Sequence, residues 1–217
     1  MTQTLESIST SIIAIAKLLH QKNMLAAADG NISYRVDNEH ILITPSGKAK
    51  AFITPAEMAV ITLDNKIISG NPSGERLMHL TIYQHCPTAK CVVHAHPPSA
   101  IAWSISNKKL KSLPSDSLSE LILTTPTIPI VPYARPGTQS MGNNLIPYLP
   151  ELKLFILAHH GALAWGETVD EAWYGMERLE HTADILLRAT MLRKIESLPK
   201  KEIKALHKLR EQLKSST

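Results

Sequence analysis

Apolar residues recur at helical spacing near both ends of the chain, and short apolar runs lie between them. Residues 5–24 carry an apolar stripe at steps of three to five residues, which predicts an amphipathic helix. Residues 168–193 and 200–214 predict two further helices. The short apolar runs predict strands at 32–36, 40–44, 60–63, 66–69, 91–96, 128–133, 153–158 and 162–165.

Turn and cap residues organise these elements. Asp37-Asn38 and Asp64-Asn65 join the first four strands into two hairpins. Thr54-Pro55-Ala56-Glu57 has the pattern of a helix start, with proline at the first helical position. Further helices are predicted at 73–86, 99–106 and 138–148. We therefore expect an α/β fold, a single domain over residues 1–217 with three layers, α/β/α, around a mixed, largely antiparallel central sheet.

Composition and charge exclude several classes of protein. The 217 residues include only two cysteines, too few for a disulfide scaffold, and no apolar run approaches the ~20 residues that span a bilayer. The N-terminus lacks the basic and apolar regions of a signal peptide, so we expect a cytoplasmic protein with no membrane partner. Much of the net charge of +4 lies near the C-terminus, where glutamates interrupt the lysines and no aromatic side chain is interleaved. That pattern is typical of a solvated helix face, and we expect no nucleic-acid partner.

Three histidines stand where predicted strands end. His94 and His96 are two residues apart, so their imidazoles point to one face of a strand that Pro97-Pro98 terminates. His160 also ends an apolar strand and precedes a glycine. Two strand histidines alone would be an ordinary polar pair, but three neutral imidazoles with an open fourth position are what a catalytic zinc site needs. Glu75, at the start of a predicted helix, is the carboxylate that could complete the ligand shell or move protons.

Three short turns are rich in glycine, serine and asparagine. They are Gly30-Asn31-Ile32-Ser33, Thr44-Pro45-Ser46-Gly47 and Ser73-Gly74. Each offers backbone N–H groups and a hydroxyl or amide to a phosphate, and the third also opens a helix. Any one alone would be an ordinary turn. Beside a three-histidine metal site, the three together indicate an anion-binding pocket.

These motifs occur in the order found in the class II aldolase/adducin family, and the resemblance covers residues 8–190. It implies the class II aldolase-like fold, with His94, His96 and His160 as ligands of one zinc ion per subunit. It also implies that Glu75 is the catalytic acid/base. The residues that would hold a substrate phosphate are Asn31, Ser46, Gly47, Ser73 and Gly74.

The resemblance further implies a zinc-dependent aldolase acting on a phosphorylated sugar. The expected substrate is a ketose 1-phosphate of the L-fuculose 1-phosphate type, cleaved to dihydroxyacetone phosphate and an aldehyde. Cleavage leaves an enediolate, whose charge zinc stabilises as a Lewis acid without a Schiff-base lysine. The family forms tetramers with active sites at subunit boundaries, so a homotetramer is expected.

The chain departs from the aldolase pattern in its proton donors. That pattern has a tyrosine after the helix that follows the histidine pair, and another in the C-terminal tail, but residues 113–123 and 198–217 contain none. Glu120, Tyr133 or water could take the place of the tyrosine, and Glu120 is favoured because it lies in the corresponding stretch. An acidic residue in that stretch also fits a methylthioribulose-1-phosphate dehydratase, a relative on the same fold. A non-catalytic, adducin-like interaction module is the third alternative, and retention of all three histidines argues against it.

Two other groups of polar residues have alternative interpretations. Glu177, Glu180, His181 and Asp184 share the long helix at i,i+4 spacing, where a solvated or subunit-facing surface is favoured over a metal cluster. His79 follows Glu75 by one helical turn on the same face, where it could act as a supporting contact to the site or as an ordinary structural histidine.

Overall fold

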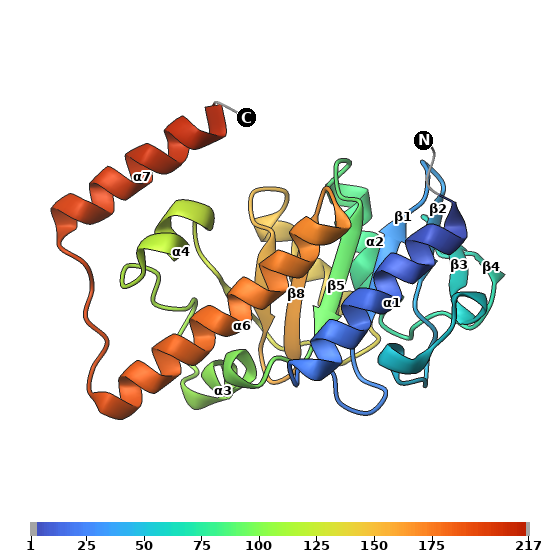
Figure 1. Ribbon diagram of the computed structural model, residues 1–217, viewed down its shortest axis with the longest axis horizontal. Helices are drawn as coiled ribbons and strands as arrows, with labels where there is room; N and C mark the ends of the chain where they lie inside the picture. Colours follow the sequence, from blue (N-terminus) through green and yellow to red (C-terminus); the bar gives the residue numbers. More distant parts are fainter. Residues whose placement is uncertain (1–3, 216–217) are drawn as a thin grey trace.

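The computed structural model describes residues 4–215, and its strands form an eight-stranded sheet (Figure 1). The strands are β1 (Asn31–Arg35), β2 (His40–Ile43), β3 (Ala59–Thr62), β4 (Ile67–Ser69), β5 (Cys91–Ala95), β6 (Ile130–Val131), β7 (Leu154–Leu157) and β8 (Gly161–Gly166). Their order across the sheet is β4-β3-β2-β1-β5-β8-β7-β6. The pairing of β6 with β7 is parallel and the other pairings are antiparallel, which confirms the predicted mixed, largely antiparallel sheet.

Helices cover both faces of the sheet and complete the predicted three layers. They are α1 (Leu5–Gln21), α2 (Arg76–His85), α3 (Pro98–Ser106), α4 (Ser119–Thr124), α5 (Gln139–Asn143), α6 (Val169–Leu192) and α7 (Lys200–Ser215). Figure 1 shows α1 and α6 in front of the strands and α2 behind them. The terminal helix α7 lies against α4, where Arg210 donates to the carbonyl oxygen of Ile122 at 3.1 Å. Within residues 4–215, none of the helices is both long and apolar enough to cross a membrane.

The alternation of side chains along β5 assigns each residue to one of two cores. Cys91, Val93 and Ala95 pack in the core shared with α1 and α6, whereas Val92 packs in the core shared with α2. His94 therefore points to the α2 face of the sheet, and its side chain has no exposed surface.

Two predicted helices are shorter than the sequence pattern indicates. The capping-box segment forms a single 3-10 turn, Pro55–Glu57, because the chain enters β3 at Ala59 to pair with β2. The helix predicted over 138–148 ends at Asn143 and is followed by a separate 3-10 turn, Ile146–Tyr148. Pro147 explains this break, since its ring would clash with the carbonyl group four residues earlier and it has no N–H to donate.

Candidate metal and substrate site

Three imidazoles converge where β5 ends beside the start of β8. His94 lies in β5, His96 directly follows that strand, and His160 directly precedes β8. The Nε2 atom of His94 is 3.3 Å from Nε2 of His96 and 3.1 Å from Nε2 of His160. Among residues 4–215, this is the one group of three or more His, Cys, Asp or Glu side chains whose potential ligand atoms all lie within 4.8 Å of one another.

The protonation of these histidines suits a metal ion. Nδ1 of His94 lies 2.8 Å from the carbonyl oxygen of Ala162, which only accepts, so Nδ1 carries the hydrogen and Nε2 presents a lone pair to the cluster. Nδ1 of His96 faces a carboxylate oxygen of Asp29 at 3.4 Å, the kind of contact that orients a metal-binding imidazole. Burial, helped by the charges of His94 and His160, lowers the pKa of His96 to about 4. Tetrahedral zinc with bonds of ~2.0–2.1 Å separates its nitrogen ligands by roughly 3.3–3.4 Å, so the observed spacing fits that ion.

The Glu75 carboxylate faces the three imidazoles from the start of α2. Glu75 is the N-cap residue of this helix, but its side chain turns into the site and makes no capping hydrogen bond. Its Oε1 lies 3.0 Å from Nε2 of His160, and its Oε2 lies 3.2 Å from Nε2 of His94. Burial raises the pKa of the Glu75 carboxyl, but hydrogen bonds from His160 and His94, when these imidazoles are protonated, lower it by more, so the net pKa lies well below its usual value. An ionised carboxylate beside nitrogen lone pairs requires a proton or a cation between them, which is a second indication of a metal ion.

A chain of buried hydrogen bonds supports this carboxylate from the α2 side. Nδ2 of Asn31 donates to Oε2 of Glu75 at 2.8 Å, which turns the Asn31 carbonyl oxygen toward Nε2 of His79, 2.5 Å away. Because that oxygen only accepts, His79 carries its hydrogen on Nε2, and its Nδ1 accepts the Ser33 hydroxyl at 2.7 Å. The Ser33 oxygen then accepts the Tyr83 hydroxyl at 2.8 Å. Burial lowers the pKa of His79 to about 3, so this ring is a neutral link in the chain.

The predicted anion-binding turns, Glu75 and two of the three clustered histidines line one hollow of about 480 Å³, called here the histidine hollow. Its wall contains every substrate-binding residue predicted from the sequence, namely Asn31, Ser46, Gly47, Ser73 and Gly74. Glu75, His96 and His160 lie in the same wall. Backbone hydrogen bonds between segments 44–46 and 71–73 tie two of the turns together. The fold therefore brings together side chains that are far apart in the sequence.

Two glycines allow the backbone to approach the histidines closely. Gly30 has a φ of +68°, and a Cβ atom there would lie 2.3 Å from Leu25 and 2.8 Å from the carbonyl oxygen of His94. A Cβ atom at Gly161 would lie 2.5 Å from the carbonyl oxygen of Ala95 and 3.0 Å from Cε1 of His94. Neither position has room for a side chain unless His94 or its strand moves.

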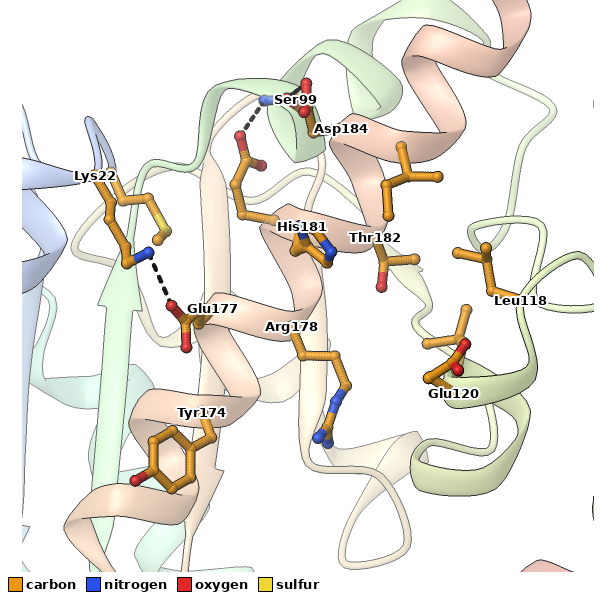
Figure 2. Close-up of a pocket in the computed structure, with 14 residues that line it drawn as sticks. Lys22, Ser99, Leu118, Glu120, Tyr174, Glu177, Arg178, His181, Thr182 and Asp184 are labelled. Carbon is orange, nitrogen blue, oxygen red and sulfur yellow. Dashed lines mark hydrogen bonds and ion pairs between the residues drawn. The ribbon is translucent and has the colours of Figure 1, made fainter.

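Glu120 lies apart from the histidine hollow. It is an exposed residue of α4 and lines a separate groove of about 930 Å³ beside α6, called here the helix groove. Figure 2 shows Glu120 on α4, across this groove from Arg178 and His181 on α6. Within one described chain the structure therefore does not bring Glu120 to the metal-site residues. Its catalytic role stays a prediction that requires a second copy of the chain.

The acidic residues of α6 have partners of their own in the helix groove. The Glu180 carboxylate accepts the backbone N–H groups of Ser99 and Ala100, at 2.9 and 3.0 Å, at the start of α3. Glu177 forms an ion pair of 2.9 Å with Lys22, as Figure 2 shows. These contacts favour the interpretation of this cluster as a helix surface.

Lys50 lines the histidine hollow but was not predicted from the sequence. It is one of two lysines that flank Ala49 just after a turn, a pattern typical of an exposed loop. The structure buries Lys50 instead, in a single 3-10 turn, Lys50–Phe52, that packs against α1. The only signal in the sequence is that Lys50 directly precedes the apolar run Ala51-Phe52-Ile53.

The sequence profile of the Class II Aldolase and Adducin N-terminal domain matches residues 10–187. The chain belongs to this family, which confirms the resemblance seen in the motifs. Class II aldolases typically depend on a metal ion, and the three-histidine cluster gives this chain a place for one.

Relatives within the family differ in the reaction that their names describe. The chain is 32% identical over 176 residues to an L-fuculose phosphate aldolase from Methanococcus maripaludis, with 81% of this chain and 94% of that protein covered. It is 30% identical over 187 residues to a 3-oxo-tetronate 4-phosphate decarboxylase from Escherichia coli, with 83% and 86% covered. The crystal structure of YgbL from Escherichia coli superimposes with a TM-score of 0.86 at 29% identity and covers 94% of this chain and 100% of that one.

Proposed function

We propose that this protein is a zinc-dependent lyase that cleaves a carbon–carbon bond of a phosphorylated sugar, one zinc ion being held per subunit. The observation that carries the proposal is the convergence of three imidazole nitrogens and the Glu75 carboxylate beside the hollow that the anion-binding turns line. We further propose aldolase cleavage of a ketose 1-phosphate of the L-fuculose 1-phosphate type, in line with the aldolase relative.

His94, His96 and His160 are the proposed ligands of the metal ion. Bound zinc would supply a Lewis acid for the oxygen atoms next to the bond that breaks. Ala162 and Asp29 fix two of the rings through their Nδ1 atoms, so the Nε2 lone pairs point inward without reorganisation.

Glu75 is the proposed acid/base. Its carboxylate is held by Asn31 and lies within 3.2 Å of two imidazole nitrogens, so it is placed beside any substrate oxygen that reaches the metal position. A carboxylate fixed in this way can move a proton between carbon and oxygen positions of a bound substrate.

The turn residues are proposed to hold the substrate phosphate through Ser46, Gly47, Ser73 and Gly74. Their hydroxyl and backbone N–H groups are the donors that phosphate oxygens accept. Asn31 has one remaining amide hydrogen for this purpose, because its carbonyl oxygen and its other hydrogen are already used by His79 and Glu75.

Decarboxylation of a phosphorylated 3-oxo sugar acid is the second candidate, and a specific observation favours it. Aldol cleavage requires a base that takes the proton from the hydroxyl group on the carbon that becomes the aldehyde. Glu120, the favoured substitute for the tyrosine of the aldolase pattern, lies in the helix groove. Loss of carbon dioxide requires no such base, because the electron pair of the broken bond stays on the neighbouring carbon. That carbon then takes a proton that comes from solvent water and that Glu75 would relay. The Escherichia coli decarboxylase relative is consistent with this reaction.

We propose a homotetramer because the family resemblance implies one. An aldolase that uses Glu120 would need a neighbouring subunit to bring it to the histidine hollow, whereas Tyr133 and water are the alternatives to Glu120. Light scattering that shows a monomer at working concentration would remove Glu120 from the aldolase scheme.

The reaction is tested by incubating the zinc-loaded protein with four substrates separately. They are L-fuculose 1-phosphate, L-rhamnulose 1-phosphate, 5-methylthioribulose 1-phosphate and 3-oxo-tetronate 4-phosphate. Zinc-dependent release of dihydroxyacetone phosphate from either of the first two supports the aldolase, and carbon dioxide from the fourth supports the decarboxylase. A diketone from the third would instead identify a dehydratase. No turnover of any of the four would contradict the proposed function.

A further inference from the structure

A buried lysine lies in the wall of the histidine hollow. Lys50 is 4% exposed, and its ammonium group donates a short hydrogen bond to the carbonyl oxygen of Ala28, in the turn that leads into β1. Among the described residues that line the hollow, it is the only lysine or arginine. It shares the wall with Ser46 and Ser73.

The ammonium group of Lys50 lacks a close counter-charge. Within residues 4–215, no carboxylate oxygen lies within 4.0 Å of it. Burial lowers the pKa of Lys50, while the more distant charges of Asp29 and Glu75 raise it. One of its three N–H donors goes to Ala28, which leaves two for another acceptor. A buried cation without a paired anion is unfavourable unless a ligand supplies the negative charge.

We propose that Lys50 is a specificity-determining residue that binds the phosphate group of the substrate. This inference rests on the proposed function, because it takes the histidine hollow as the substrate site. Lysine acts as a point charge toward phosphate, and the neighbouring turns supply uncharged donors for the remaining phosphate oxygens. If Lys50 were absent, the charged side chains of this wall would be Asp29 and Glu75, and both repel an anion.

Lys48 provides a matched control two residues away. It is exposed, is ion-paired with Glu57 at 2.6 Å and lies outside the wall of the hollow. Lys48→Gln and Lys50→Gln remove the same charge from the same segment. The glutamine amide can still donate to Ala28, so Lys50→Gln separates the charge from the hydrogen bond.

The test measures the affinity of the metal-loaded protein for inorganic phosphate by isothermal titration calorimetry, with metal content determined for every variant. We expect Lys50→Gln to bind phosphate about tenfold or more weakly, since a hydrogen bond to a charged group is lost, and Lys48→Gln to match the wild type within about twofold. Lys50→Arg keeps the charge and should retain most of the affinity. Equal affinity in Lys50→Gln and the wild type would reduce Lys50 to a structural role and overturn the proposal.

Two further measurements complete the test: a second anion, acetate, and a modification experiment on the wild type. Acetate in place of phosphate should bind weakly, and its affinity should be the same in Lys50→Gln and the wild type. If Lys50→Gln lost more affinity for acetate than for phosphate, Lys50 would be assigned to a carboxylate ligand and the phosphate assignment would be overturned. If Lys50→Gln fails to fold, amine modification of the wild type followed by mass spectrometry replaces it. Phosphate should then slow modification of Lys50 but not of Lys48, and equal rates with and without phosphate would overturn the proposal. None of these readouts needs turnover, so failure of the proposed reaction would be recognised separately.

Discussion

Replacement of Gly161 by alanine should disrupt the metal site while leaving the fold largely intact. The new Cβ atom would lie 2.5 Å from the carbonyl oxygen of Ala95 and 2.8 Å from Cδ2 of His96, whereas ordinary contact begins at 3.4 Å. The shortfall of about 0.9 Å at Ala95 falls on backbone, because the β5–β8 ladder pairs Ala95 with Ala162 there. Such overpacking costs about 1–3 kcal/mol of unfolding free energy. Metal–ligand distances tolerate only about 0.2 Å, so we expect metal affinity to fall at least about tenfold.

Gly74→Ala is the matched control for this change. Gly74 also lies in the wall of the histidine hollow, but an added Cβ atom there meets no heavy atom within 4 Å. Zinc affinity is measured by competition with a chromogenic chelator, and stability by urea denaturation without metal. Gly74→Ala should keep wild-type zinc affinity. Wild-type affinity in Gly161→Ala as well would show that the close approach of β8 does not set the geometry of the histidines.

The remaining predictions concern the side chains of the site. His160→Ala should lose most of the bound zinc, whereas His159→Ala, at the preceding residue outside the cluster, should keep it. Both are measured as metal equivalents after gel filtration, and the reverse result would make His159 the ligand in place of His160. Glu75→Gln should keep fold and metal but abolish most turnover of whichever substrate proves active, and wild-type rates would exclude Glu75 as the acid/base. His79→Leu should lower the unfolding free energy by about 2–4 kcal/mol, because it leaves the buried Asn31 oxygen and Ser33 hydroxyl without partners. His79→Gln can still donate a hydrogen bond to Asn31, so its unfolding free energy, measured by urea denaturation, should fall by less. Equal decreases in the two variants would refute this reasoning.

The position of the metal-site residues was largely predictable from the sequence. His94 and His96 fall at the end of an apolar run halted by prolines, and His160 falls where another apolar run reaches a glycine. The alternation of side chains along a strand decides to which face of the sheet each imidazole points, and the length of the strand decides how near its end the histidine lies. Both are local properties of the sequence. The antiparallel pairing of β5 with β8 then brings the two strand ends together.

The burial of a side chain against elements that are distant in the sequence could not be predicted from such local properties. Lys50 follows the exposed Lys48, and nothing local distinguishes the two ammonium groups. Lys50 reaches the histidine hollow only because the 3-10 turn Lys50–Phe52 packs against α1. Glu120 shows the opposite case, since its place in the chain suggested the active site while the fold of one chain puts it in the helix groove.

The pairing of β1 with β5 explains how the Glu75 carboxylate, the proposed acid/base, is held against the three clustered histidines. Asn31 lies directly opposite His94 in this antiparallel ladder, so both side chains leave the sheet on the α2 face. Asn31 then orients Glu75, which reaches His94 from α2. A register slip of one residue would turn Asn31 to the α1 face and place Ile32 opposite His94. The apolar side chain of Ile32, buried in the core with α1, opposes that slip, so hydrophobic packing on one face of the sheet fixes the polar geometry on the other.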